Sequence, residues 1–299
     1  MTDTDGEAVV ALYCSYTRGT RRLRSLSNFY TTEYMPVSLA KTVDSERAWD
    51  LLADFIACER PAWTSVEFRM LRQENASCHP FFSRLADAGF HIYQYPLYEN
   101  WFTSIKDTSF ENYFQNLTSR LRNTIRRKSK KLQRQDSVRI KTFSTPRDNI
   151  AKAIRDYVDV YNSSWKKPEP YENFIPKLVE SCANSGTLLL GILYLGKRPV
   201  AAQLWIITKA KALIYKLAYV EDQSEFSPGS ILSKALFEIA IDDYKPLEID
   251  YGIGNETYKA DWMDERRFIY VLHGYNKRNI VGLTYTVLHK IKTLLKKVL

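Results

Sequence analysis

The chain has 299 residues, of which 45% are hydrophobic and 26% charged, so it can bury a substantial core and is not a disordered polymer. Its net charge of +9 is concentrated in two segments, because residues 119–141 carry +9, residues 277–299 carry +6 and the remainder carries −6. This distribution does not indicate a generally basic surface of the kind that binds nucleic acid. The N-terminus is acidic, unlike a signal peptide, and no run approaches the ~18 apolar residues of a membrane span, so we expect a cytoplasmic protein.

The first half of the chain alternates helices and strands. Residues 1–30 look irregular, and apolar spacing then predicts helices at 45–59 and 79–90 and strands at 63–71 and 91–98. A long basic helical stretch follows at 109–135, with a break near Leu117–Thr118, and a strand at 137–145. The turn that begins at Pro146 is typical of a boundary, so we predict a first domain over 1–147.

The second half is predicted as a mixed α+β domain over 148–280, followed by a basic amphipathic helix over 281–299. Two helices come first, and the later elements are a meander of three strands, a helix, a strand, a short helix and a last strand that closes the same domain. Their predicted ranges are 149–165, 172–184, 187–195, 199–207, 212–220, 227–243, 247–252, 256–263 and 267–276.

The cysteines and histidines do not form a metal-binding pattern. Cys14, Cys58, Cys78 and Cys182 are scattered, no CxxC occurs, and no histidine stands near a cysteine at metal-ligand spacing. We therefore expect reduced, mostly buried thiols and no metal site.

The junction between the third meander strand and the next helix reads Ser-Pro-Gly. Ser227 suits an N-cap, Pro228 suits the first helical position, and Gly229 leaves the backbone uncovered. Free N–H groups at a helix start attract phosphate, although an ordinary capped helix has the same letters. The lack of Gly-Lys-Ser/Thr argues against a P-loop nucleotide hydrolase.

Several segments together resemble a known family. They are YNSSWKKPEPY (161–171), RPVAAQLWII (198–207), IYKLAYVEDQSEFSPGSIL (214–232), EIDYGIGNETYKADWM (248–263) and RRFIYVLHGYN (266–276). They look like the CelD/BcsL-like acetyltransferases of the GNAT superfamily, which are related to Fem-type aminoacyltransferases. The resemblance implies the GNAT acyl-CoA N-acyltransferase fold in two tandem GNAT-like units, the first of them degenerate. It also implies transfer of an acyl group, in the first instance acetyl, from acyl-CoA to an amine or hydroxyl, in cell-surface polysaccharide metabolism.

The resemblance implies where acyl-CoA would bind. In such folds the strand before the phosphate-binding helix splays from the next strand, and the pantetheine arm enters the gap. Here the gap would lie between 212–220 and 247–252. The implied cofactor-binding residues are Leu217, Tyr219, Ser227, Gly229 and Ser230.

Acyl transfer from a thioester needs a deprotonated acceptor, a stabilised oxyanion and a proton for the leaving thiolate. We predict Asp250 as the group that orients or deprotonates the acceptor, Tyr258 as the proton donor and Lys259 as a positive charge beside it. A turn-capping carboxylate, a packed tyrosine and a solvated lysine are the structural alternatives. The predicted substrate-binding residues, for which packing is again the alternative, are Trp165, Tyr171, Gln203, Lys216 and, as a backup base, His273.

The two basic segments leave three interpretations open. Residues 120–134 could form a solvated face, recruit an anionic acceptor or membrane, or bind RNA, in that order of preference. In the C-terminal helix Val287, Leu288, Ile291, Leu294, Leu295 and Val298 share a face that could pack on the body or lie on an anionic membrane. The preferred partner is a small-molecule or glycan-precursor acceptor, and nucleic acid is not expected. The rival functions are an aminoacyl-tRNA-dependent, Fem-like transferase and a non-catalytic membrane- or nucleic-acid-binding module.

Overall fold

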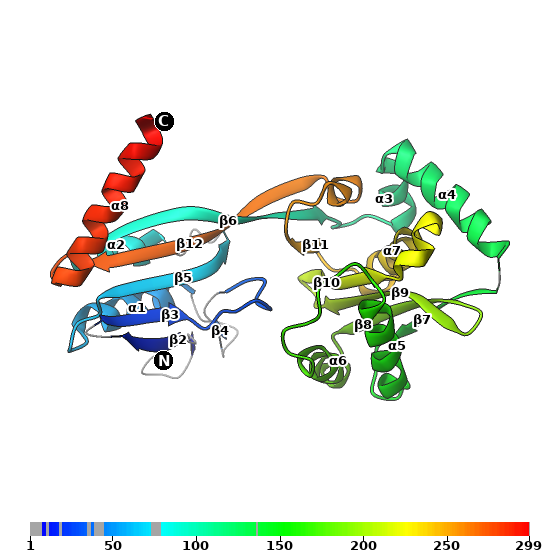
Figure 1. The fold of residues 1–299 in the computed structure, drawn as a ribbon, viewed down its shortest axis with the longest axis horizontal. Coiled ribbons are helices and arrows are strands. Elements are labelled where there is room, and N and C mark those ends of the chain that lie inside the picture. Colours follow the sequence, from blue (N-terminus) through cyan, green and yellow to red (C-terminus); the bar gives the residue numbers. More distant parts are fainter. Residues whose placement is uncertain are drawn as a thin grey trace. The chain divides into compact units, whose positions relative to one another are not determined.

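The computed structural model describes residues 8–9, 12–17, 20–34, 37–38, 45–72, 79–135 and 137–298. The chain divides into two compact units (Figure 1). Unit 1 comprises Met1–Glu99 with Arg267–Leu299, and unit 2 comprises Asn100–Arg266. None of the helices in the described part of the chain combines the length and hydropathy needed to cross a bilayer.

Unit 2 contains a mixed sheet with the strand order β6-β11-β10-β9-β8-β7. The meander β7 to β10 is antiparallel, β11 runs parallel to β10, and the end of β6 pairs antiparallel with β11. The strands are β6 (Phe90–Ser104), β7 (Val138–Phe143), β8 (Leu188–Leu195), β9 (Arg198–Ile207), β10 (Lys211–Tyr219) and β11 (Glu248–Ile253). The helices are α3 (Phe110–Asn116), α4 (Ser119–Gln133), α5 (Ile150–Asn162), α6 (Phe174–Ser185) and α7 (Pro228–Ile239), with short helical turns η2 (Glu221–Phe226), η3 (Ala240–Tyr244) and η4 (Thr257–Asp261).

The core of unit 2 forms because β8 is apolar along almost its whole length and is covered on both faces. Figure 1 shows α5 and α7 on opposite sides of β8 and β9. Gly191 lets α7 approach closely, because a Cβ at this position would lie 2.6 Å from Leu236 Cδ2. On the other face, the Tyr194 hydroxyl donates a hydrogen bond to Asp156 of α5.

The predicted break in the long basic helix is confirmed. α3 ends at Asn116 and α4 begins at Ser119, with Leu117 extended and the Thr118 hydroxyl accepting from the Leu121 N–H. Leu121, Ile125 and Leu132 form the buried stripe of α4. The helix α4 and the strand β7 belong to unit 2, because α4 packs on α7 and β7 pairs with β8. The units therefore divide at Glu99 and Arg266 rather than at the predicted boundary after residue 147.

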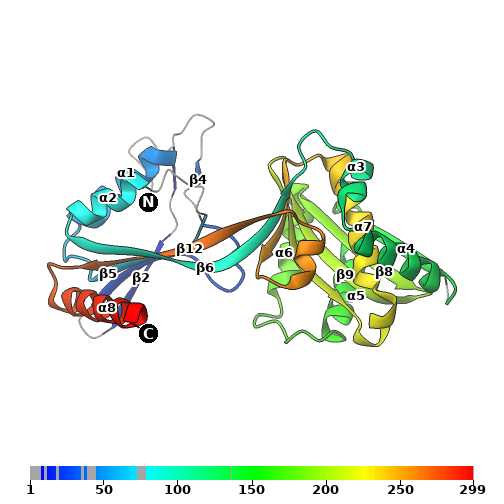
Figure 2. The same ribbon diagram turned by 90° about the horizontal axis from the view of Figure 1, so that it is seen from above.

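Unit 1 contains strands of mixed direction in the order β2-β3-β5-β12-β6, and β6 has residues in both units. Figure 2 shows α1 and α2 on one side of this sheet and α8 on the other. Phe68 of β5 meets Phe81 of α2 edge to face, with ring centroids 5.1 Å apart. The elements are β2 (Leu12–Thr17), β3 (Thr20–Ser25), α1 (Ser45–Cys58), β5 (Ser65–Arg72), α2 (His79–Asp87), β12 (Glu265–Asn276) and α8 (Ile280–Val298), with a separate small pair β1 (Ala8–Val9) and β4 (Val37–Ser38).

Two sequence expectations about the strands are wrong. Residues 12–17 and 20–25 are not irregular, because β2 and β3 pair antiparallel despite the arginines of β3. The strand predicted at 267–276 does not close unit 2, because β12 pairs antiparallel with β5 of unit 1. The last residues of β6 pair with β11 instead.

The predictions for the C-terminal helix and the cysteines can also be compared with the structure. Val287, Leu288 and Ile291 are exposed while Thr286 is buried, so the apolar face of α8 does not pack on the body; the side chains of Leu294, Leu295 and Val298 lie outside the described residues. Cys182 is buried as expected, but Cys58 is exposed. The side chains of Cys14 and Cys78 also lie outside the described residues.

Candidate functional site

The strands β10 and β11 part after a short parallel contact. Their register runs from Lys211 opposite Glu248 to Leu213 opposite Asp250, and β10 is then irregular between Ile214 and Lys216. A cavity of about 260 Å³ lies in unit 2, and residues from both strands beyond the paired segment line it. The lining residues are Leu121, Trp165, Gln203, Leu217, Tyr219, Ser224, Ser227, Gly229, Ser230, Ser233, Tyr251, Tyr258, Asp261 and Trp262.

All five predicted cofactor-binding residues therefore line one cavity. Leu217 and Tyr219 come from β10, and Ser227, Gly229 and Ser230 come from the first turn of α7 and the residue before it. Gly229 is needed for close packing, because a Cβ there would lie 3.2 Å from the Tyr219 ring. The start of α7 thus forms one wall of the space between the diverging strands.

Ser227 begins the helix differently from the prediction. Its backbone is left-handed, with φ 51° and ψ 50°, and its side chain makes no capping hydrogen bond. Its carbonyl oxygen accepts instead from the N–H groups of Ser230, at 3.1 Å, and Ile231, at 3.2 Å. Ser227 lines the cavity together with Ser224 and Ser230.

Gln203 fixes α7 on the sheet. Its amide nitrogen donates to the Gly229 carbonyl, at 3.0 Å, and to Ser233 Oγ, at 2.8 Å. Its amide oxygen accepts from Trp205 Nε1 at 3.0 Å. The predicted substrate-binding glutamine is therefore buried with protein partners on both ends, and its contacts give it a positioning role.

Two tyrosines form the opposite wall. Tyr251 of β11 and Tyr258 of η4 lie edge to face, with centroids 5.6 Å apart. Burial, followed by the neighbouring Tyr258, raises the pKa of Tyr251, whereas a hydrogen bond with Ser233 opposes that rise. Burial, reinforced by the Glu256 carboxylate, raises the pKa of Tyr258 as well. Both phenols are therefore neutral and keep their protons well into the alkaline range.

Asp250, the predicted base, does not line the cavity. Its Oδ1 accepts from Asn100 Nδ2 at 2.6 Å and from the Gly252 N–H at 2.7 Å. Its Oδ2 lies 3.6 Å from Lys211 Nζ. The alternation of the strand places Tyr251, not Asp250, toward the cavity, so the carboxylate caps the irregular end of β11. The catalytic role predicted for Asp250 therefore stays a prediction, made for a carboxylate outside the described lining.

Lys259 is likewise turned into the protein. It is 3% exposed, donates to the Ile253 carbonyl at 2.7 Å, and lies 2.8 Å from Glu256 Oε2. Its ammonium also lies 5.7 Å from the centre of the Tyr251 ring. Lys259 therefore ties the end of β11 to η4, which positions Tyr258, and it does not stand in the cavity.

Some of the predicted substrate-binding residues line the cavity and others do not. Trp165 lines the cavity and packs on Tyr219 at 4.5 Å between centroids. Lys216 pairs with Glu169 at 2.7 Å outside the lining, and Tyr171 is 65% exposed. Lys166, which sequence reasoning passed over, is buried enough to lower its pKa to about 8, and the charge of Lys216 adds to the effect.

His273 belongs to unit 1. Its Nε2 lies 2.5 Å from Glu67 Oε2, and it lines another cavity formed within that unit. The predicted role of His273 as a backup base therefore stays a prediction. Within the described part of the chain no cluster of histidine, cysteine and acidic residues could hold a metal ion.

The basic helix α4 stands beside the start of α7. Lys128 donates to the Glu225 carbonyl, and Lys131 Nζ lies 2.6 Å from the Glu225 carboxylate. Arg120 pairs with Asp261, a cavity-lining residue, at 2.8 Å. The helix therefore holds η2 in place while Arg126, Arg127 and Lys130 remain on its exposed surface.

Comparisons with known proteins agree with this geometry. A family model described as the acetyltransferase (GNAT) domain matches residues 119–260. The C-terminal domain of a putative lysylphosphatidylglycerol synthetase from Agrobacterium fabrum is similar with a TM-score of 0.61 at 14% identity, over 96% of this chain and 86% of that one. FemX is similar with a TM-score of 0.58 at 9% identity, over 90% and 85%. A search of the curated proteins gave no match.

The parted strands, the helix that starts between them and the matching family model define a GNAT-type, acyltransferase-like domain in this chain. At 9–14% identity the likeness to the two solved structures establishes the fold alone. The predicted mixed α+β GNAT fold is therefore confirmed. The finer resemblance to CelD/BcsL-like proteins stays a prediction.

Proposed function

We propose that unit 2 transfers an acyl group from acyl-CoA to an amine or hydroxyl acceptor. The observation that carries this proposal is the cavity between β10 and β11, which opens where the two strands cease to pair and where α7 begins. An unpaired strand edge offers backbone hydrogen bonds to an extended arm. The helix start offers N–H and hydroxyl donors to a phosphate.

The residues present fit the co-substrate in two respects. Leu217, Tyr219 and Trp165 supply apolar and aromatic walls for an extended chain. Ser224, Ser227 and Ser230 surround the start of α7, where the helix dipole favours negative charge. Acyl-CoA, when bound, supplies the acyl group as a thioester.

Within the cavity Tyr258 is the residue suited to deliver a proton. Its raised pKa keeps the phenol protonated at neutral pH, and the phenol stands in the lining with Tyr251 behind it. An acceptor X–H loses its proton as the bond to the acyl carbon forms, and the departing sulfur gains one, so the net proton count is unchanged. Asp261 is the carboxylate in the described lining, and its pairing with Arg120 keeps it oriented there.

The proposed acceptor is a small molecule or a glycan precursor of a cell-surface polysaccharide, as the family resemblance implies. An aminoacyl-tRNA donor is the second candidate. The exposed arginines and lysines of α4 beside the start of α7 favour it, because they could meet a nucleic acid backbone. FemX and the lysylphosphatidylglycerol synthetase domain share the fold of this chain. Acyl-CoA and aminoacyl-tRNA would each have to bind to that fold.

Calorimetric titration with acetyl-CoA tests the proposal. Leu217→Trp fills the cavity and should weaken binding about tenfold or more, because the added ring occupies the space of the bound chain. Leu247→Trp is the matched control, since Leu247 is 55% exposed in the same unit and does not line the cavity. Binding of charged tRNA without measurable binding of acetyl-CoA would instead select the second donor.

We also propose that α8 lies on an anionic membrane surface. Ile280 is 85% exposed and Leu288 is 55% exposed, while Thr286 and Gly282 face the sheet, so the apolar side of the helix points away from unit 1. Exposed Lys290 and Lys292 adjoin that side. An apolar stripe flanked by lysines complements the acyl chains and negative headgroups of an anionic bilayer.

A further inference from the structure

The sheet of unit 1 has one apolar face and one unusually polar face. Val66 and Phe68 of β5 are fully buried, and the Phe68 ring packs on Phe81 of α2, a helix that covers one side of this sheet (Figure 2). The alternate positions carry arginine, glutamate, histidine and tyrosine on β3, β5 and β12. A face of this composition does not form a hydrophobic core, so its side chains need another explanation.

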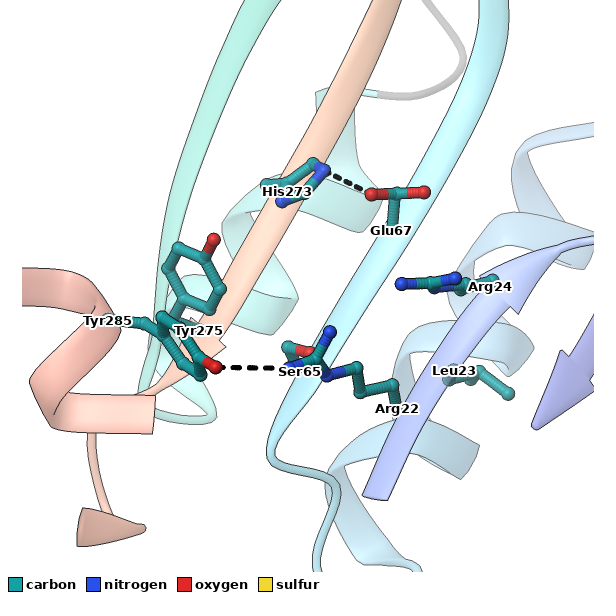
Figure 3. Close-up of a pocket in the computed structure, with 8 residues that line it drawn as sticks. All are labelled: Arg22, Leu23, Arg24, Ser65, Glu67, His273, Tyr275 and Tyr285. Carbon is teal, nitrogen blue, oxygen red and sulfur yellow. Dashed lines mark hydrogen bonds and ion pairs between the residues drawn. The ribbon is translucent and has the colours of Figure 1, made fainter. Parts of the chain in front are cut away.

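A cavity of about 140 Å³ lies on the polar face, between the sheet and α8 (Figure 3). This volume is roughly that of four or five water molecules, which suits a single small ionic group. Its polar lining consists of Arg22 and Arg24 from β3, Ser65 and Glu67 from β5, Tyr275 from β12 and Tyr285 from α8, together with His273.

The negative charge of Glu67 is already compensated by protein groups. Glu67 lies 2.5 Å from His273 Nε2 and 4.0 Å from Arg69 Nη1. The hydrogen bond with His273 lowers the pKa of this carboxyl group, and the charges of Arg24 and Arg69 add to that effect while burial opposes it. Glu67 is therefore ionised and paired, and the lining of the cavity also contains the two arginines of β3.

Tyrosines next to the arginines of β3 make hydrogen bonds at the cavity. Arg22 Nη2 donates to the Tyr285 hydroxyl at 3.1 Å, which uses one of the five N–H groups of the guanidinium. The Tyr275 hydroxyl accepts from the Tyr93 hydroxyl at 3.1 Å, which holds the Tyr275 ring in the lining. Donors thus reach the cavity from β3, β5, β12 and α8.

We propose that this cavity binds a phosphate group, which Arg22 and Arg24 would hold with help from the surrounding hydroxyls. A tetrahedral oxyanion can accept from several directions at once, whereas the two oxygens of a carboxylate lie in one plane and would use fewer of these donors. The site is independent of acyl transfer, because every lining residue belongs to unit 1. The phosphate can be free in solution or part of a lipid headgroup that reaches the protein beneath α8.

Titration of the full chain with inorganic phosphate in chloride buffer, followed by calorimetry, tests the proposal. The double variant Arg22→Gln/Arg24→Gln should lose at least about tenfold in affinity, because it removes both charge-assisted donors. Arg84→Gln is the matched control: Arg84 is an arginine of unit 1 on α2, paired with Asp50 and Asp54 outside the cavity. Acetate should bind more weakly than phosphate to the unaltered protein.

Vesicles of phosphatidylglycerol, compared with phosphatidylcholine, distinguish the source of the phosphate. A loss of phosphatidylglycerol binding in the double variant but not in Arg84→Gln assigns the site to a lipid headgroup. Unchanged vesicle binding with lost binding of inorganic phosphate assigns it to a soluble ligand. Circular dichroism and melting of each variant establish that the fold is retained. Equal phosphate binding by the unaltered protein and the double variant, or no phosphate binding in either arm, would overturn the proposal.

Discussion

The two units use the same local arrangement of strands for different ends. In unit 2, β10 and β11 are parallel neighbours with α7 between them in the chain, and in unit 1, β3 and β5 are parallel neighbours with α1 between them. Each parallel register has three residue pairs. Each also ends on a carboxylate of the second strand, Asp250 opposite Leu213 and Glu67 opposite Arg24.

Beyond those three pairs the units differ. In unit 2 the strands part and aromatic and hydroxyl side chains line the space that opens. In unit 1 the Ser25 hydroxyl accepts from the Arg69 N–H at 3.0 Å, so a side chain bridges the two strands where the pairing stops. The unit 1 cavity is instead lined by residues of the paired segment, on the polar face of the sheet. A shared order of elements therefore does not imply a shared site, because the strands differ beyond their paired segments.

The largest expected effect is on acyl transfer, the activity proposed for unit 2 and not for unit 1. Tyr258→Phe removes the proposed proton donor, so kcat with acetyl-CoA should fall about 100-fold while the affinity for acetyl-CoA changes little. Tyr171→Phe is the matched control, since Tyr171 is exposed and lies outside the cavity lining. Because the pKa of Tyr258 is raised, the rate that depends on its proton should persist through pH 10. An undiminished kcat in Tyr258→Phe would assign the proton delivery to another group.

The next prediction concerns the two carboxylates that end the parallel pairs. Asp250→Ala removes the acceptor of the Gly252 N–H and one of the acceptors of the Asn100 amide, which also donates to the Gly252 carbonyl, so we expect a loss of about 2 kcal/mol in the free energy of unfolding. Glu67→Ala in unit 1 should cost less, about 1 kcal/mol, because Glu67 is more accessible to water. Urea denaturation measures both. A normal stability for Asp250→Ala combined with lost turnover would restore the catalytic role that the sequence suggested.

Membrane binding should depend on unit 1 alone. Val287→Asp places a charge on the exposed apolar side of α8, so partition onto phosphatidylglycerol vesicles should weaken about tenfold. Leu247→Asp makes the same kind of change on an exposed residue of unit 2 and should have no effect. Cosedimentation with vesicles at two salt concentrations measures the partition. Equal losses in both variants would contradict a specific role for α8.

Local signals predicted most of the elements, whereas long-range pairing was beyond the sequence. The break at Leu117–Thr118 follows from the capping residue Thr118, and the helix after Ser227 follows from Pro228 at its first position and from apolar spacing, which are properties of adjacent positions. The crossing of β6 from unit 1 to unit 2 and the return of β12 depend on which distant strands pair, and no local pattern encodes that choice. At the site, alternation separated Asp250 from Tyr251 correctly. Which of the two faces the cavity is decided by the packing of α7 and η4, so Tyr251 was missed.

The smallest expected effect concerns Lys166, whose pKa falls to about 8 through burial and the charge of Lys216. Below pH 8 this lysine is charged in the folded and the unfolded chain, and the folded state bears the cost of burying that charge. Between pH 8 and the ordinary lysine value the folded state has lost the proton while the unfolded state still binds it, so this residue makes stability rise with pH. Lys166→Met should therefore stabilise the protein by about 1 kcal/mol at pH 7 and by less at pH 10. Lys167→Met, at the exposed neighbouring position, should show no such dependence. Urea denaturation at the two pH values measures the difference, and a gain that grows toward pH 10 would mean that Lys166 is stabilised as a cation, with Glu169 outweighing its burial.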